Sequence, residues 1–127
     1  MREKLTELLK HSYSPYSKFP VAAIVVMKDG REFSGVNVEN ASYGATICAE
    51  RSAIVSAISH GYKKGDFKEL YIMVNTEKVS TCCFLCRQVM TELFDKDVKI
   101  TCMSQTEEKV FTVNDFCPYP FDEGDLK

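Results

Sequence analysis

The apolar residues in the first third of the chain follow two different patterns. Leu5, Leu8 and Leu9 recur at helical spacing, which predicts a short opening helix over about residues 2–11. Residues 21–27 are apolar without interruption, which is typical of a strand buried on both faces. Asp29 and Gly30 then favour a hairpin turn, and residues 32–38 return as a second strand. The chain is therefore expected to begin with a helix followed by a β-hairpin.

Helical and strand patterns alternate along the rest of the chain. Residues 47–60 contain neither Gly nor Pro, and Gly61 follows them, so a second helix is expected there. The Ala and Ser residues of this segment predict a helix that is nearly all buried. A third helix is expected over residues 83–94. Three further strands are expected over residues 70–74, 98–102 and 110–113. The order predicts a single α/β domain over residues 1–127, with helices packed on a mixed sheet.

Length and composition are those of one ordinary globular domain, with 127 residues, of which 45% are hydrophobic and 27% charged. The net charge is −2 and there is no basic stripe, which disfavours a nucleic-acid partner. No run reaches the roughly 18 apolar residues of a membrane span. The first residues lack the apolar core of a signal peptide. We therefore expect a cytoplasmic protein without a membrane partner.

Six cysteines in such a chain favour a metal site or free thiols over disulfides. Cys48 and the pair Cys83 and Cys86 lie at the starts of two expected helices, where the helix dipole stabilises a thiolate. Three thiolates leave one position open on a tetrahedral zinc ion, as in catalytic sites. Arg51, one helical turn after Cys48, is expected to offset the negative charge at the metal. Glu50 is expected to carry protons rather than to bind the metal.

Two simpler explanations compete with a zinc site. Cys48 can be a core thiol beside a chance C-x-x-C, or Cys83 and Cys86 can be a redox pair. Neither explanation accounts for Glu50 two residues after Cys48. Within the zinc hypothesis, Cys82 is a rival ligand to Cys83, because its spacing to Cys86 is also helical.

Four segments of the chain resemble the cytidine deaminase family, in particular its small three-cysteine members that act on free nucleosides. They are residues 14–21, 35–44, 46–51 and 86–89. Zinc deaminases share a His or Cys with Glu two residues later, followed by Pro-Cys-x-x-Cys. The resemblance covers nearly the whole chain. It implies a three-layer fold, in which a mixed five-stranded sheet carries helices on both faces.

The resemblance implies zinc-dependent hydrolytic deamination of cytidine and deoxycytidine to uridine and deoxyuridine, a reaction of pyrimidine salvage. One Zn²⁺ per subunit is then held by Cys48, Cys83 and Cys86. Water activated at the metal attacks C4 of the ring. Glu50 passes protons to the ring N3 and then to the leaving amine.

Four further residues are expected at the substrate by the same resemblance. Asn37 and Glu39 match a sugar-binding pair, and because they are two apart at a strand end, both side chains are expected on one side. Phe19 matches an aromatic residue that packs against the base or sugar. Phe121 resembles a C-terminal aromatic that reaches the active site of a neighbouring subunit, within a homotetramer. Simple packing of Phe19 and solvated strand-end side chains are the alternatives.

The second cysteine motif departs from the family pattern Pro-Cys-Gly-x-Cys. Cys82 stands in place of Pro, and Phe84 stands in place of Gly. Phe84 is expected to crowd the base pocket if that Gly provides clearance. Other functions therefore stay open: deamination of a modified cytosine nucleoside of the blasticidin type, a catalytically inactive zinc-binding relative, and, against the acidic charge, a polynucleotide deaminase.

Overall fold

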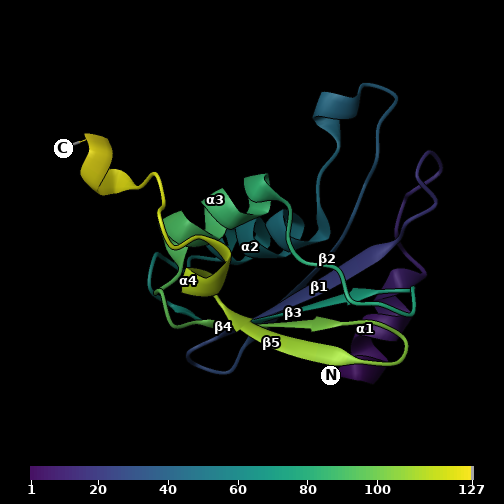
Figure 1. Ribbon diagram of the computed structural model, residues 1–127, viewed down its shortest axis with the longest axis horizontal. Coiled ribbons are helices and arrows are strands. Elements are labelled where there is room, and N and C mark those ends of the chain that lie inside the picture. Colours follow the sequence, from purple (N-terminus) through teal and green to yellow (C-terminus); the bar gives the residue numbers. More distant parts are fainter. Residues whose placement is uncertain (127) are drawn as a thin grey trace.

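A five-stranded mixed sheet forms the middle layer of the structure, a computed structural model that describes residues 1–126 (Figure 1). The strand order is β2-β1-β3-β4-β5. The strands are β1 (Val21–Met27), β2 (Glu32–Val36), β3 (Phe67–Val74), β4 (Lys99–Met103) and β5 (Glu108–Thr112). Strands β3 and β4 pair in parallel, and the other three pairs are antiparallel. The predicted fold class is therefore confirmed.

Helices cover both faces of this sheet. Helix α1 (Arg2–Leu9) packs on one face, and helices α2 (Ala49–Ser59) and α3 (Phe84–Leu93) pack on the other. The uninterrupted apolar run of β1 is explained by this arrangement. Ala22 and Ile24 belong to the core under α1, whereas Ala23 and Val25 belong to the larger core under α2 and α3. Within residues 1–126, none of the helices has the length and apolar character that a membrane span requires.

The second helix is shorter and more exposed than the sequence predicts. It begins at Ala49 rather than at Ile47, because the backbone of Ile47 forms two hydrogen bonds with Val38. The expectation that it is nearly all buried is wrong, since Val55 is 52% exposed and Ile58 is 38% exposed. Ala and Ser content therefore did not reveal the outer face of this helix.

The last part of the chain also departs from the expected boundaries. The final strand lies at Glu108–Thr112, and a short helix α4 (Val113–Phe116) follows it. Thr112 and Asp115 form a capping box that starts α4, with each side chain bonded to the other residue's backbone N–H. A 3₁₀ helix over Glu123–Leu126 ends the described chain.

Gly35 on β2 allows α2 to lie directly against the sheet. A Cβ atom at this buried position would lie 2.6 Å from the carbonyl oxygen of Ala49 and 2.6 Å from the amide nitrogen of Ala53. Both are backbone atoms of α2, so the whole helix would have to move. Gly35 therefore fixes the start of α2 against the edge of the sheet.

Replacing Gly35 by alanine is expected to lower the free energy of unfolding by about 1–3 kcal/mol, because the added methyl group overpacks a backbone contact. Urea denaturation followed by circular dichroism measures the change. Gly44→Ala is the matched control, since a Cβ atom there meets nothing within 4 Å. Equal unfolding midpoints for the two variants would contradict the expected role of Gly35.

Candidate metal centre and active site

Three thiol groups converge where α2 and α3 begin. Cys48 is the residue before α2, Cys83 is the residue before α3, and Cys86 lies in the first turn of α3. The sulfur atoms of Cys48 and Cys83 are 3.6 Å apart, and those of Cys83 and Cys86 are 3.5 Å apart. Sulfur ligands at about 2.3 Å from a tetrahedral zinc ion lie about 3.8 Å from one another. The cluster therefore fits zinc in both ligand type and spacing.

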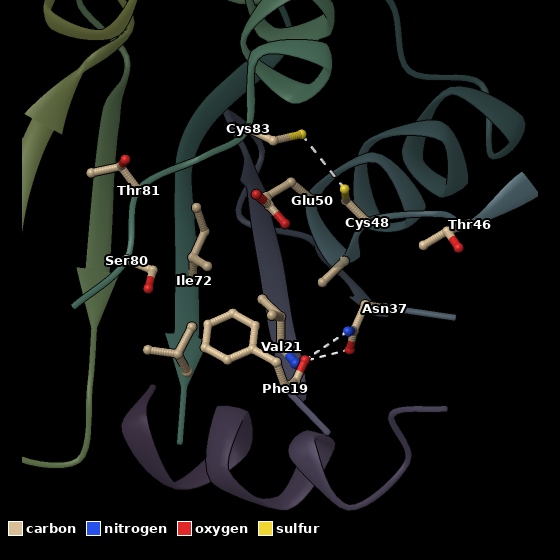
Figure 2. Close-up of a pocket in the computed structure, with 12 residues that line it drawn as sticks. Phe19, Val21, Asn37, Thr46, Cys48, Glu50, Ile72, Ser80, Thr81 and Cys83 are labelled. Atoms are coloured by element: carbon tan, nitrogen blue, oxygen red, sulfur yellow. Dashed lines mark hydrogen bonds between the residues drawn. The ribbon is translucent and has the colours of Figure 1, made fainter. Parts of the chain in front are cut away.

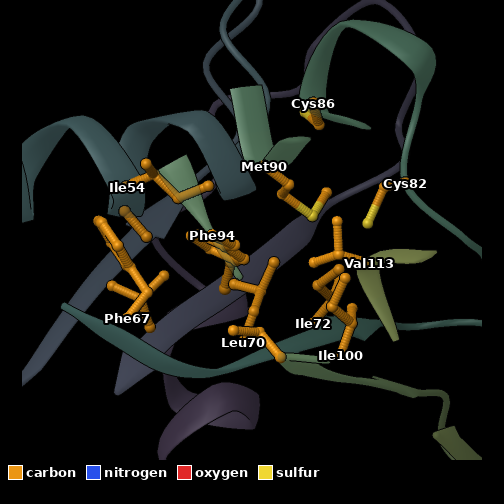
Figure 3. Packing of buried hydrophobic residues seen from close by; sticks show 14 of the residues in the cluster. Ile54, Phe67, Leu70, Ile72, Cys82, Cys86, Met90, Phe94, Ile100 and Val113 are labelled. Atoms are coloured by element: carbon orange, nitrogen blue, oxygen red, sulfur yellow. The ribbon is translucent and has the colours of Figure 1, made fainter. Parts of the chain in front are cut away.

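Cys82 does not join this cluster. Its side chain is buried in the hydrophobic core under α2 and α3, on the side of Met90 and Val113 (Figure 3). Burial raises the pKa of the Cys82 thiol far above its usual range, which keeps the thiol neutral. The structure thus places Cys83, and not Cys82, with Cys48 and Cys86.

Arg51 lies against the thiols, as its helical spacing predicts. Its Nη2 donates a hydrogen bond to the sulfur of Cys48 at 3.5 Å. Hydrogen bonds from Cys86 and from Arg51 lower the pKa of Cys48 to about 5, so a thiolate forms readily at this position. The same contact with Cys48 raises the pKa of the Arg51 guanidinium.

Arg87 supports the segment before α3 instead of the sulfur atoms. Its guanidinium donates to the carbonyl oxygens of Cys82 at 2.7 Å and Phe116 at 3.1 Å. It also lies over the rings of Phe84 and Phe116, at 4.6 and 4.8 Å from their centroids. The side chain of Phe84 is 76% exposed on this outer surface. The expectation that Phe84 crowds the pocket is therefore wrong.

Glu50 is the second residue of α2, and its carboxyl group faces the pocket beside the sulfur atoms of Cys48 and Cys83 (Figure 2). Only 5% of the residue is exposed. Burial raises the pKa of Glu50, and a hydrogen bond to its own backbone offsets part of this effect. A carboxyl group with a raised pKa is suited to accept and release a proton near neutral pH.

Glu50 and the sulfur atoms of Cys48 and Cys83 lie at one end of a pocket that opens to solvent. Ile72 and Val74, from alternate positions of β3, form part of its apolar wall. The other lining residues are Phe19, Val21, Asn37, Thr46, Ala49, Ser80 and Thr81.

Asn37 is buried at the wall of this pocket, and most of its hydrogen-bonding capacity is already used. Its Oδ1 accepts hydrogen bonds from the backbone of Val21 at 2.8 Å and from the hydroxyl of Ser12. Its Nδ2 donates to the carbonyl oxygen of Phe19 at 2.9 Å. An amide group has two N–H bonds, so within the described chain one donor is left for a ligand.

Glu39 lies in a second hollow that shares Thr46 with the pocket. The sequence predicted that Asn37 and Glu39 face one side, and the structure places them in these two adjoining spaces. The Glu39 carboxylate accepts hydrogen bonds from the backbone of Tyr16 at 3.0 Å and of Ser17 at 3.1 Å, and from the Ser17 hydroxyl. The Ser17 hydroxyl is the main reason that the pKa of Glu39 is lowered.

The two aromatic residues expected at the substrate differ in position. Phe19 lines the pocket, as predicted. Phe121 lies outside the residues that line the pocket of its own chain and is 59% exposed. Its carbonyl oxygen accepts a hydrogen bond from Gln88 at 2.8 Å.

The sequence did not indicate that Ser12, Ser17, Thr46 and the β3 residues contribute to the pocket, to the hollow or to the contacts of Asn37 and Glu39. Residues 70–74 of β3 are an uninterrupted apolar run, in which Ile72 and Val74 occupy alternate positions and therefore face one side of the sheet. The serines carry no comparable signal, since isolated hydroxyl groups are common in loops.

Comparison with known proteins gives one consistent result. Residues 1–102 match the family described as the cytidine and deoxycytidylate deaminase zinc-binding region. The chain is 40% identical over 116 residues to a cytidine deaminase of Halalkalibacterium halodurans, which covers 91% of this chain and 86% of that protein. It is 34% identical over 115 residues to a cytidine deaminase of Mycoplasma genitalium, with 89% and 86% covered. The crystal structure of cytidine deaminase from Burkholderia pseudomallei has a TM-score of 0.89 and 38% identity, and 94% of each chain is covered.

Proposed function

Because this chain belongs to the zinc-binding cytidine and deoxycytidylate deaminase family, we propose that it hydrolyses cytidine and deoxycytidine to uridine and deoxyuridine, with release of ammonia. One observation carries the proposal. Three thiols lie at the spacing of zinc ligands, and two of them, Cys48 and Cys83, line one pocket together with a buried carboxyl group. Such a reaction would serve pyrimidine salvage.

The chain's own residues divide the work of this reaction. Zinc, when held by Cys48, Cys83 and Cys86, supplies the Lewis acidity that generates a nucleophile from water near neutral pH. Glu50 takes a proton from the attacking water and delivers it to N3 of the cytosine ring. It then takes the remaining proton from the oxygen added at C4 and gives it to the amino group, which leaves C4 as ammonia. Arg51 balances the charge of the thiolates through its contact with Cys48.

The polar residues around the sugar favour a nucleoside over a nucleotide. The N–H of Asn37 is suited to donate a hydrogen bond to a sugar hydroxyl, and the carboxylate of Glu39 is suited to accept one from a sugar hydroxyl. Among residues 1–126, those that line the pocket and the adjoining hollow include Glu39 and Glu50 but no lysine or arginine. A phosphate group would therefore meet negative charge without a compensating cation. Phe19 completes the apolar wall against the base.

The assay that tests this proposal follows the ultraviolet absorbance of cytidine mixed with the zinc-loaded protein. We expect loss of the aminopyrimidine band and release of one ammonia per cytidine, and the same result with deoxycytidine. Stoichiometric zinc without turnover would instead favour an inactive relative. Faster turnover of a blasticidin-type nucleoside than of cytidine would favour the modified-nucleoside alternative.

We further propose that four copies of the chain assemble, with Phe121 of one copy at the pocket of another. The proposal is supported by exposed apolar side chains on α2, at the start of α3 and in the tail, which include Val55, Ile58, Phe84, Leu85 and Phe121. Exposed apolar groups of this kind mark interaction surfaces.

Sedimentation equilibrium is expected to give a mass of about four times 14.4 kDa. Phe121→Ala is expected to raise the KM for cytidine, because the substrate loses an aromatic contact worth about 1 kcal/mol. A monomer with full activity would contradict the assembly.

The thiol ligands also support our proposal of a cytoplasmic location, where thiols stay reduced.

A further inference from the structure

The segment from Ser12 to Val21 forms hydrogen bonds with both residues that are expected to bind the sugar, Asn37 and Glu39. The backbone N–H of Tyr13 donates to the carbonyl oxygen of Asn37 at 3.0 Å, and the N–H of Glu39 donates to the carbonyl oxygen of Tyr13 at 2.8 Å. The Asn37 side chain is tied to the same segment at Phe19 and Val21. The shape of this segment and the orientation of the sugar-binding side chains are therefore set together.

Ser17 occupies the central place in this network. Its hydroxyl donates to Oε2 of Glu39 and accepts a hydrogen bond from the backbone N–H of Phe19 at 3.1 Å. Its backbone N–H donates to the other carboxylate oxygen, which also accepts from Tyr16. One side chain thus joins the carboxylate in the hollow to the backbone of the aromatic residue that lines the pocket.

The next residue turns the chain so that this bridge can form. Lys18 has a backbone φ of +55°, a left-handed conformation that residues other than glycine rarely adopt. Its N–H donates to the carbonyl oxygen of Ser14 at 2.9 Å, which closes the turn. Such backbone strain is retained where the surrounding structure requires it, often beside a binding site.

The hydrogen bonds from Tyr16 and Ser17 use most of the acceptor positions of the Glu39 carboxylate. A carboxylate offers about four acceptor positions. Tyr16 and Ser17 occupy three of them, two on Oε1 and one on Oε2. The remaining position is on Oε2, the oxygen that the Ser17 hydroxyl orients.

We infer that Ser17 is a positioning residue for sugar recognition, which holds the Glu39 carboxylate so that Oε2 accepts a hydrogen bond from one sugar hydroxyl. This inference rests on the proposed function, since it takes a cytosine nucleoside as the ligand. A side chain that only stabilises the loop would affect all substrates equally, whereas Ser17 acts through one hydroxyl of the sugar.

The experiment measures kcat and KM of the zinc-loaded protein with cytidine, 2′-deoxycytidine and 3′-deoxycytidine. Ser17→Ala is expected to raise the KM for cytidine about tenfold, the usual effect of losing a hydrogen bond to a charged group, with kcat within about twofold of the parent. For the substrate that lacks the hydroxyl bound by Glu39, parent and variant are expected to have equal KM. Ser17→Thr keeps a hydroxyl and is expected to restore the KM for cytidine.

Two further variants separate positioning from general stability. Ser59→Ala is the control, because Ser59 is exposed at the end of α2 and lines neither the pocket nor the hollow. It is expected to leave the KM for every substrate unchanged. In a Glu39→Gln background, Ser17→Ala is expected to raise KM no further, because both changes remove the same interaction. If the alanine variant does not fold, Ser17→Cys, a weaker donor of similar size, replaces it and should give an intermediate KM.

Three results would overturn the inference: an unchanged KM in Ser17→Ala, an equal rise in KM with all three substrates, or additive effects of Ser17→Ala and Glu39→Gln. A parent protein that turns over cytidine while any of these is observed keeps the proposed function and loses only the role of Ser17. A parent protein that leaves all three nucleosides unchanged overturns both.

Discussion

Replacing Cys83 by serine is expected to lower the zinc content well below one ion per chain and to reduce kcat with cytidine by at least about a thousandfold. Zinc coordination depends on a thiolate, and without the metal the water loses most of its activation. The sulfur of Cys83 lies within 3.6 Å of the other two thiols, so no other described cysteine takes its place without moving the loop. Metal analysis after exhaustive dialysis measures the first effect, and the ultraviolet assay measures the second.

Cys82→Ala is the control for this prediction, because it removes a sulfur atom from the adjacent residue. Cys82 is buried in the core, so its loss is expected to cost about 1 kcal/mol of stability through a small cavity. Zinc content and kcat are expected to stay near those of the parent. Loss of zinc from Cys82→Ala, with zinc retained by Cys83→Ser, would show that the ligand is the other thiol.

Hydrophobic periodicity predicted the α/β class and most of the helices and strands, whereas the three-layer arrangement was implied by the family resemblance. The apolar run of β1 and the turn at Asp29 and Gly30 are local signals, and each was found at its expected place. The start of α2 was predicted two residues early because Ile47 pairs with Val38, a contact between residues that lie nine positions apart in a loop. Local patterns carry no information about such a bridge.

The site could be predicted as a set of residue types, but not as a set of orientations. Spacing and resemblance identified the thiols and Glu50, which the structure brings together. They did not give the orientation of Phe84, because a side chain at a helix start can point into the pocket or outward. Its contact with Arg87, which stacks against Phe116 from the far end of the chain, explains the outward orientation. Tertiary partners of this kind are invisible in a local motif.

Ser17 illustrates the same limit at the sugar end of the site. The sequence marks Glu39 as a candidate ligand but does not show that three donors from Tyr16 and Ser17 already hold its carboxylate. The acceptor positions that are already occupied on such a carboxylate can be counted only when its hydrogen-bond donors are known. The structure therefore shows how many further hydrogen bonds each candidate ligand residue can still form.

Replacing Glu50 by glutamine is expected to lower kcat by about a thousandfold or more while zinc stays bound, since general acid–base catalysis typically contributes 10²–10⁴-fold. Glutamine has nearly the same shape but cannot carry the proton from water to N3 of the base. At neutral pH the unfolding midpoint is not expected to fall, because burial raises the pKa of Glu50 and a neutral amide avoids the cost of a buried carboxylate.

The control for this variant is Glu3→Gln, because Glu3 is the second residue of α1 as Glu50 is the second residue of α2, but is exposed. Both variants lose one negative charge near a helix start, so the dipole effect is matched. Only Glu50 faces the pocket that holds the thiols, so only its replacement should abolish turnover. Zinc-loaded Glu50→Gln with near-parental kcat would remove this carboxyl group from the proton transfer, and the three-thiolate site would then need another base.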